Sequence, residues 1–208
     1  MTPATPSVAS VDCGGIAPVV VCVPGVPVPQ PRPKVRVIGH GKSARGHAYV
    51  PKTHAVHAWR NAVAAAARRA FAGLGRLGEK LDGNVRADML LVLPRPQSLN
   101  RKKDPAGLDW CPRRPDLDNL VKAIKDALGE GVLDGKGQCV ADGVLVDDAR
   151  VISGEPLKCI AEKGGQPRVE IILSIETRTP EDAWAAIRRR AGLDADEPTT
   201  HQGALPLG

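Results

Sequence analysis

The chain has 208 residues, of which 42% are hydrophobic and 25% are charged, so we expect a globular domain with a buried core. Its 29 Lys and Arg residues exceed its 23 Asp and Glu residues and give a net charge of +6. Only 2% of the residues are aromatic, which argues against a module that binds single strands by stacking bases on aromatic side chains.

Three features favour a cytoplasmic protein. The longest uncharged run, residues 13–31, is broken by five prolines, whereas a membrane span needs about 20 mostly apolar residues. The N-terminus lacks the Lys or Arg that begins a secretory signal. The five cysteines form no CxxC pair, which predicts reduced thiols rather than a disulfide framework or a zinc site.

The positive charge is concentrated in one segment. Between Gln30 and Arg76 the sequence has ten basic residues and no acidic residue. This distribution favours a polyanionic partner, and a solvated basic face is the alternative. The same segment holds four histidines, for which a metal site is a further hypothesis, weakened because no carboxylate is near: His40, His47, His54 and His57.

The first half of the chain predicts a strand and a helix. Residues 1–18 are rich in Pro, Ser, Ala and Thr, which is typical of a flexible tail. A buried strand is predicted over 18–24, followed by a long loop or irregular hairpin over 26–49. Thr53 is the expected N-cap of an Ala-rich helix that reaches about Ala72.

The second half predicts more strands and a second main helix. Apolar residues alternate over 85–93 as in a half-buried strand, and the proline-rich residues 94–115 predict a loop. An apolar stripe predicts a helix over 117–128, and the glycines of 129–143 predict a loop. Later strands are expected near 144–146, over 149–162 with an interruption at 154–156, and over 168–176, before a helix over 180–191.

This order of elements predicts one α+β (α/β-like) domain with a small mixed sheet and two main helices. Its expected bounds are 19–177. A flexible tail over 1–18 precedes it, and a helix with a disordered tail over 178–208 follows.

Two carboxylates flank the predicted start of the second helix. Asp116 and Asp118 are separated by Leu117, whose apolar side chain faces the core, so both carboxylates can point the same way. Asn119 follows, and Lys122 lies one helical turn after Asp118. Mg²⁺ is bound by one or two carboxylates and keeps waters for a phosphate, so this pattern suggests a metal site. The alternative is that both aspartates cap the helix, where Asp is favoured.

A second acidic pair, Asp147 and Asp148, falls where one predicted strand ends and another begins. Adjacent carboxylates repel one another, so a pair beside apolar strands suggests a cation or a basic group between them. The alternative is a turn, where Asp is common. Lys122 has an alternative as well, which is an ordinary surface ion-pair ladder with Asp118 and Asp126.

The two acidic motifs together resemble a known family. Arg-Pro-Asp-Leu-Asp-Asn-Leu-x-Lys-x-x-x-Asp-Ala-Leu, followed by Gly-Val-x-x-Asp-Asp-x-x-Val, resembles the signature of RusA-type Holliday-junction resolvases. These are small homodimeric, Mg²⁺-dependent endonucleases, many of them encoded by bacteriophages and prophages. The proline-rich basic opening over 24–34, and Tyr49-Val-Pro51 before the helix with Trp59, are also similar. The resemblance extends from Val19 to Ile175.

The resemblance implies a structure-specific endodeoxyribonuclease that resolves four-way junctions with Mg²⁺, or with Mn²⁺ as a substitute. The metal ligands and catalytic carboxylates would be Asp116, Asp118 and Asp148, with Lys122 as the catalytic basic residue. Asp147 and Asn119 would support the site, and Asp126 would be structural. The residues expected to bind DNA are Arg32, Lys34, Arg36, Arg113 and Arg114. The expected partners are branched DNA and a second copy of the chain, in a bacterial cytoplasm or a phage-infected cell.

Two questions stay open at this stage. The connection over 129–146 is longer than is usual in the family, and its Asp134 competes with Asp147 and Asp148 as the third ligand. A non-catalytic protein that binds branched DNA is the alternative function, although carboxylates facing phosphate would repel DNA unless a metal intervened. A cation-binding regulatory module would leave the acid-free basic segment unexplained.

Overall fold

The computed structural model of the chain describes residues 17–40 and 44–192. The chain divides into two compact units, residues 1–176 and 177–208. Most of the predicted N-terminal tail and the last residues of the predicted C-terminal tail lie outside the described residues.

The first unit is built on a six-stranded sheet with the order β1-β10-β4-β9-β5, in which β8 also pairs with β4. Antiparallel pairs join β1 to β10, β10 to β4 and β5 to β9, whereas β4 is parallel to β8 and β9. The sheet is therefore mixed, and the predicted α+β fold is confirmed. The strands are β1 (Val19–Pro24), β4 (Val85–Leu93), β5 (Asp109–Trp110), β8 (Val151–Ser153), β9 (Pro156–Ile160) and β10 (Arg168–Ile175).

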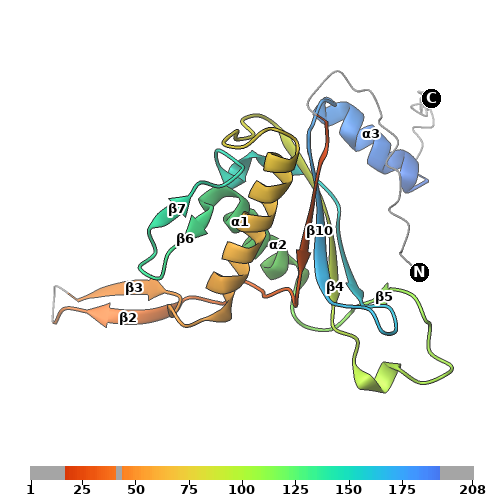
Figure 1. The fold of residues 1–208 in the computed structure, drawn as a ribbon, viewed down its shortest axis with the longest axis horizontal. Coiled ribbons are helices and arrows are strands. Elements are labelled where there is room, and N and C mark those ends of the chain that lie inside the picture. Colours follow the sequence, from red (N-terminus) through yellow and green to blue (C-terminus); the bar gives the residue numbers. More distant parts are fainter. Residues whose placement is uncertain (1–16, 41–43, 193–208) are drawn as a thin grey trace, which may run out of the picture. The chain divides into compact units, whose positions relative to one another are not determined.

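Two helices, α1 (Ala55–Gly73) and α2 (Leu117–Glu130), pack together on one side of this sheet (Figure 1). Val19, Val21 and Val23 alternate with exposed residues along β1, so every second side chain of this strand enters the core. The helix α1 begins one residue later than predicted. His54, not Thr53, is its N-cap, because the Nδ1 atom of His54 accepts the backbone N–H of Val56.

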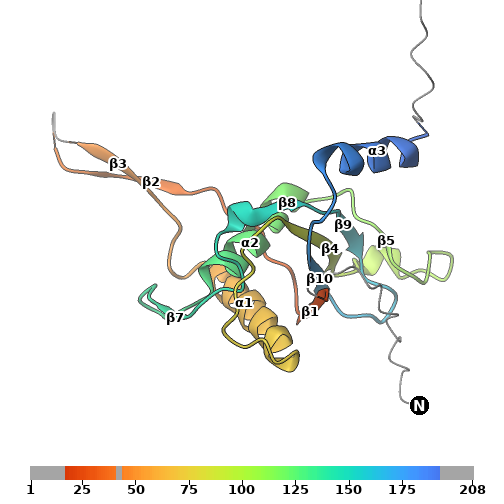
Figure 2. The same cartoon turned by 90° about the horizontal axis from the view of Figure 1, so that it is seen from above.

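The basic segment before α1 forms a separate two-stranded hairpin. Its strands are β2 (Lys34–Ile38) and β3 (Arg45–Tyr49), which pair only with each other. All residues of both strands are exposed. In Figures 1 and 2 this hairpin, here called the β2–β3 ribbon, extends away from the sheet and helices of the first unit. Of the two predicted alternatives, loop and hairpin, the structure has the hairpin.

The glycine-rich segment after α2 differs from the prediction. In place of a loop it forms a short hairpin of β6 (Val132–Leu133) and β7 (Cys139–Ala141). The strand predicted over 144–146 is wrong, since only Leu145 pairs, in an isolated bridge with Leu81. The backbone N–H groups of Val144 and Leu145 instead donate to the carbonyl of Leu128 and close the end of α2.

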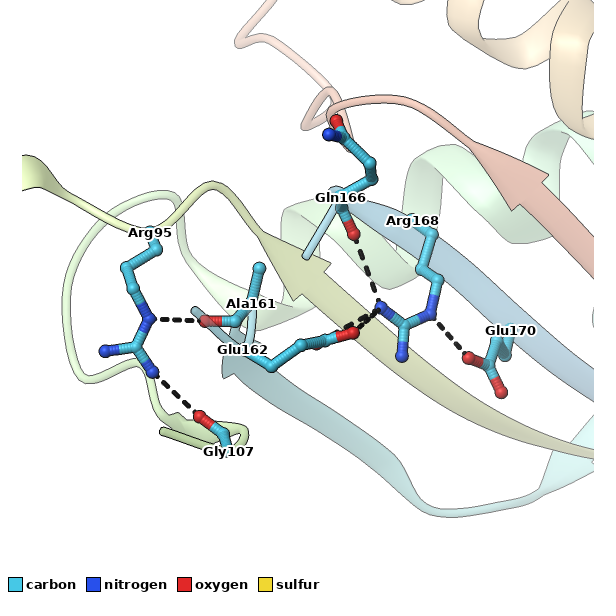
Figure 3. Close-up of polar contacts among 7 residues, drawn as sticks. All are labelled: Arg95, Gly107, Ala161, Glu162, Gln166, Arg168 and Glu170. Carbon is cyan, nitrogen blue, oxygen red and sulfur yellow. Dashed lines mark hydrogen bonds and ion pairs between the residues drawn. The ribbon is translucent and has the colours of Figure 1, made fainter. Parts of the chain in front are cut away.

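The loop between β4 and α2 is held by Arg95. Its guanidinium donates to the carbonyls of Ala161, Leu99 and Gly107, two of which are drawn in Figure 3. Within this loop lie a 3-10 turn (Gln97–Leu99) and the short β5. The loop therefore has a defined path toward the start of α2.

Near Arg95, an arginine bridges two acidic side chains at the start of β10. Arg168 forms ion pairs with Glu162 and Glu170 (Figure 3). A backbone hydrogen bond and the Arg168 guanidinium hold the pKa of Glu162 below its usual value.

The second unit contains α3 (Pro180–Arg190). Thr179 caps this helix by accepting the backbone N–H of Asp182. Acidic residues in the first turn and arginines in the last turn complement the helix dipole. None of the helices over 17–40 and 44–192 is long and apolar enough to cross a membrane.

Candidate active site

The first acidic motif lies at the exposed start of α2. Asp116 occupies the N-cap position but makes no side-chain cap hydrogen bond, and Asp118 lies in the first turn. Leu117 between them is half-buried against the core, as its apolar side chain requires. Among the described residues, neither carboxylate forms a hydrogen bond or an ion pair. The cap alternative for Asp116 therefore lacks the hydrogen bond that would support it.

The start of α2 is anchored by a lysine that the sequence analysis missed. The Nζ of Lys158, on β9, donates to the carbonyls of Arg113 and Pro115, both at 2.8 Å. A backbone bond from Gln30 to the carbonyl of Asn119, at 2.8 Å, ties the segment after β1 to the same turn. The available signal for Lys158 was a lysine within the short run Pro-Leu-Lys-Cys-Ile, which is otherwise free of charge.

Lys122 lies midway along the same face of α2. Its Nζ is 3.7 Å from Asp126 Oδ1, and its side chain is 60% exposed, whereas that of Asp126 is only 12% exposed. Burial raises the pKa of Asp126, and the nearby cations of Arg60 and Lys122 offset this only in part. The exposed ammonium of Lys122 is therefore loosely held and is available to a bound anion.

The second acidic motif lies at the other end of α2. Asp147 caps a 3-10 turn (Asp148–Arg150) and accepts the backbone N–H of Ala149 at 2.7 Å. The backbone of Asp148 lies directly against Gly129, where an added Cβ would be 3.2 Å from the Asp148 nitrogen. The carboxylate of Asp148 forms no hydrogen bond or ion pair within the described residues. A shallow hollow of about 240 Å³ is lined by Asp126, Gly129, Glu130, Val146, Asp147 and Asp148.

A single chain does not bring the two acidic motifs together. Asp118 and Gly129 are separated by about three turns of helix, a rise of 16 Å, and Asp148 lies beside Gly129. In the described parts of the chain, no group of three or more His, Cys, Asp or Glu residues is placed to hold a metal ion. The hypothetical histidine site is likewise not assembled there, and His54 is engaged as the cap of α1.

The competitor Asp134 is engaged elsewhere. Its Oδ1 accepts the backbone N–H groups of Lys136 and Gln138 at 2.8 Å in the β6–β7 turn. These hydrogen bonds lower the pKa of Asp134. Asp134 therefore has a structural role within its own turn.

The basic residues predicted to bind DNA fall in two places. Arg32, Lys34 and Arg36 lie at the base and on the first strand of the β2–β3 ribbon, and all are exposed. Arg113 and Arg114 are exposed immediately before Asp116. They line an apolar groove of about 580 Å³, beside a Trp110 side chain that is 67% exposed. Basic side chains and a pair of free carboxylates thus adjoin at the start of α2.

The family model described as Endodeoxyribonuclease RusA matches residues 24–174 of the chain. No curated protein matches the chain. The matched region contains both acidic motifs, the ribbon and every strand of the main sheet except part of β1 and the last residue of β10. The chain therefore belongs to the RusA family, which confirms the resemblance seen in the sequence, and it is an endodeoxyribonuclease that hydrolyses phosphodiester bonds in DNA.

Proposed function

We propose that the protein resolves four-way DNA junctions by Mg²⁺-dependent cleavage, with Asp116, Asp118 and Asp148 as metal ligands. The observation that carries the proposal is the pair of exposed, unpaired carboxylates at the start of α2, directly after Arg113 and Arg114. Carboxylates without internal partners, placed beside cations that attract DNA, are what a metal-dependent nuclease requires.

The donor set at the start of α2 fits Mg²⁺. Asp116 and Asp118 would supply two of the three carboxylate ligands, and Mg²⁺ keeps several waters and binds substrate phosphate directly. When bound, the ion would polarise the scissile phosphate and orient the attacking water. Asn119 is half-buried in the same turn, and its carbonyl accepts the backbone N–H of Gln30, so it would support the position of the two ligands.

Chain residues would supply the remaining electrostatic contribution. Lys122 lies one turn after Asp118, so its exposed ammonium can neutralise charge that develops on the phosphate. Arg113 and Arg114, which precede Asp116 in the chain, would hold the DNA backbone. Contacts with the phosphate backbone do not read the base sequence, so recognition would depend on the shape of the junction.

The third ligand requires a second protomer. Within one chain, Asp148 is about three helical turns from Asp118, too far for one metal ion. In a dimer with twofold symmetry, antiparallel α2 helices would place the start of one helix beside the end of the other. Asp148 of the partner subunit would then complete each site, with Asp147 orienting it. A homodimer would have two such sites, as paired cleavage of a junction requires.

A mixing experiment tests this arrangement. Asp118→Asn and Asp148→Asn are each expected to be inactive alone. In a mixed dimer, one shared site would carry both changes and the other would be intact, so mixing should restore single-strand nicking of a junction. If the sites lay within single chains, every site in the mixed dimer would carry one change, and the mixture would stay inactive.

The function itself is tested with synthetic substrates. We expect the wild-type chain to cut a four-way junction symmetrically in Mg²⁺, to cut linear duplex of the same sequence far more slowly, and to be inactive in EDTA. Equal cleavage of the junction and the duplex would contradict the proposed substrate, although not the nuclease activity.

A further inference from the structure

The β2–β3 ribbon has two chemically different faces. Directly opposite residues of an antiparallel pair share a face, and alternate residues of one strand do so as well. Arg36 pairs with His47, Lys34 with Tyr49 and Ile38 with Arg45, which places all the basic residues of both strands on one face. The other face consists only of small or apolar residues, namely Val35, Val37, Gly46 and Ala48.

The cations of this face are free, unlike several arginines elsewhere in the first unit. Among the described residues, the side chains of Lys34, Arg36, Arg45 and His47 form no hydrogen bond or ion pair. By contrast, one arginine of α1 and two of the sheet are paired with acids, namely Arg60 with Glu130, Arg86 with Asp88 and Arg168 with Glu170. No acidic residue occurs between Gln30 and Arg76, so the ribbon has no acid of its own to pair with.

The ribbon is also poorly explained as a structural element. All residues of its two strands are exposed, and none of them belongs to the core cluster. A two-stranded hairpin alone is at best marginally stable in water, so its stability should increase when it binds a partner. A polyanion complements the basic face, since the cations are free and no local acid competes with it.

We infer that the basic face of the β2–β3 ribbon is a binding surface for the phosphate backbone of a duplex arm, formed by Lys34, Arg36, Arg45 and His47. This rests on the proposed function, which supplies the DNA substrate. The face is about 14 Å long, enough to meet more than one phosphate, since each strand of a duplex carries one phosphate per 3.4 Å of helix axis. The register therefore adds two residues of β3 to the contacts expected from β2 alone.

The first test removes charge from this face. The variant Arg36→Ala with Arg45→Ala is compared with Lys102→Ala with Lys103→Ala, which removes the same charge from an exposed turn elsewhere. The Kd for a four-way junction is measured against KCl concentration, in Ca²⁺ without Mg²⁺. We expect the ribbon variant to raise the Kd about tenfold and to reduce the salt slope by about two. The control pair should change the Kd by less than about twofold, as expected for non-contacting surface charge.

The second test moves charge between the two faces. Arg36→Val combined with Val37→Arg keeps the composition and net charge of β2 but turns the arginine to the apolar face. We expect this variant to bind the junction as weakly as Arg36→Ala. Thermal unfolding should be unchanged in every variant, because the ribbon lies outside the core.

Three results would overturn the inference. Normal binding by the Arg36 and Arg45 variant would show that these cations are only solvated. Normal binding by the face-exchanged variant would show that the face does not matter. Equal weakening by Val35→Ser with Val37→Ser would show that the ribbon acts through its apolar side. Each result leaves the proposed function intact if the wild type still cuts junctions in Mg²⁺, whereas a wild type that binds no junction would overturn both.

Discussion

At the scale of single residues, the clearest predictions concern the carboxylates of Asp116 and Asp118. Asp116 and Asp118 face solvent without partners, so they would repel DNA unless a cation lay between them and the phosphate. We expect Asp116→Asn and Asp118→Asn to abolish junction cleavage while binding stays the same or becomes tighter. Because Asp116 makes no cap hydrogen bond, its variant should melt within about 2 °C of the wild type. Near-normal cleavage would refute the metal assignment, and retained cleavage with a large fall in Tm would support a capping role.

The three rival acids for the third ligand are separated by their hydrogen bonds. Asp147 and Asp134 both accept backbone N–H groups, whereas Asp148 accepts none in the described structure. We expect Asp148→Asn to reduce cleavage as severely as Asp118→Asn. Asp147→Asn should be milder, and Asp134→Asn nearly silent. Cleavage rates at saturating Mg²⁺ measure the order, and an inactive Asp134→Asn with an active Asp148→Asn would reverse the assignment.

Among the elements, the turn that leads into α2 depends on β9. Lys158 donates to two carbonyls of this turn, so Lys158→Met should displace Asp116 and lower kcat about tenfold while the Kd for the junction changes little. Lys163→Met is a matched control, since Lys163 also donates to two carbonyls, those of Arg101 and Asp104, in a different loop.

Both lysine variants should lower stability by about 1 kcal/mol in denaturant titrations. Only Lys158→Met should lower kcat. If Lys158→Met and Lys163→Met had the same kcat, Lys158 would have no positioning role.

The elements that the sequence predicted best are those with a strong period. The strand β4 occupies 85–93 as predicted because every second residue from Val85 to Leu93 is apolar and buried. The helix α2 begins at Leu117 as predicted because its apolar stripe begins there. The short strands β5, β6 and β7 were not predictable, since a strand of two or three residues has no period and forms only by pairing with its partner.

At the scale of the whole molecule, pairing of distant segments lies beyond local patterns. The strands β1 and β10 lie side by side, and Val19 pairs with Leu173, although these two residues are near opposite ends of the unit's sequence. The helix start with Asp116 was predictable, but its separation from Asp148 follows from the length of α2 and from the return of the chain to the C-terminal end of this helix. A sequence motif gives the order of its residues along the chain but not the distances between them. Because Asp118 and Asp148 are far apart within one chain, the site that we propose includes a second protomer.

The β6–β7 hairpin has a consequence for local unfolding. It is joined to α1 by Asn61, whose side chain donates to the carbonyl of Leu133 and accepts its N–H, and few of its residues are buried. Such a segment should open without unfolding the domain, so its amides should exchange with solvent far faster than those of β4. Asn61→Ala should speed this exchange further while β4 stays protected.

Acid should have the same local effect on this hairpin. The backbone donors hold the pKa of Asp134 below its ordinary value. The ionised carboxylate therefore stabilises the hairpin at neutral pH, and this stabilisation is lost as the pH falls through the lowered pKa. Exchange rates across β6–β7 and β4 at two acidic pH values, corrected for intrinsic exchange, would measure it. Equal exchange rates in the hairpin and in β4 would instead show that the hairpin opens only when the whole domain unfolds. This long connection would then be as stable as the core.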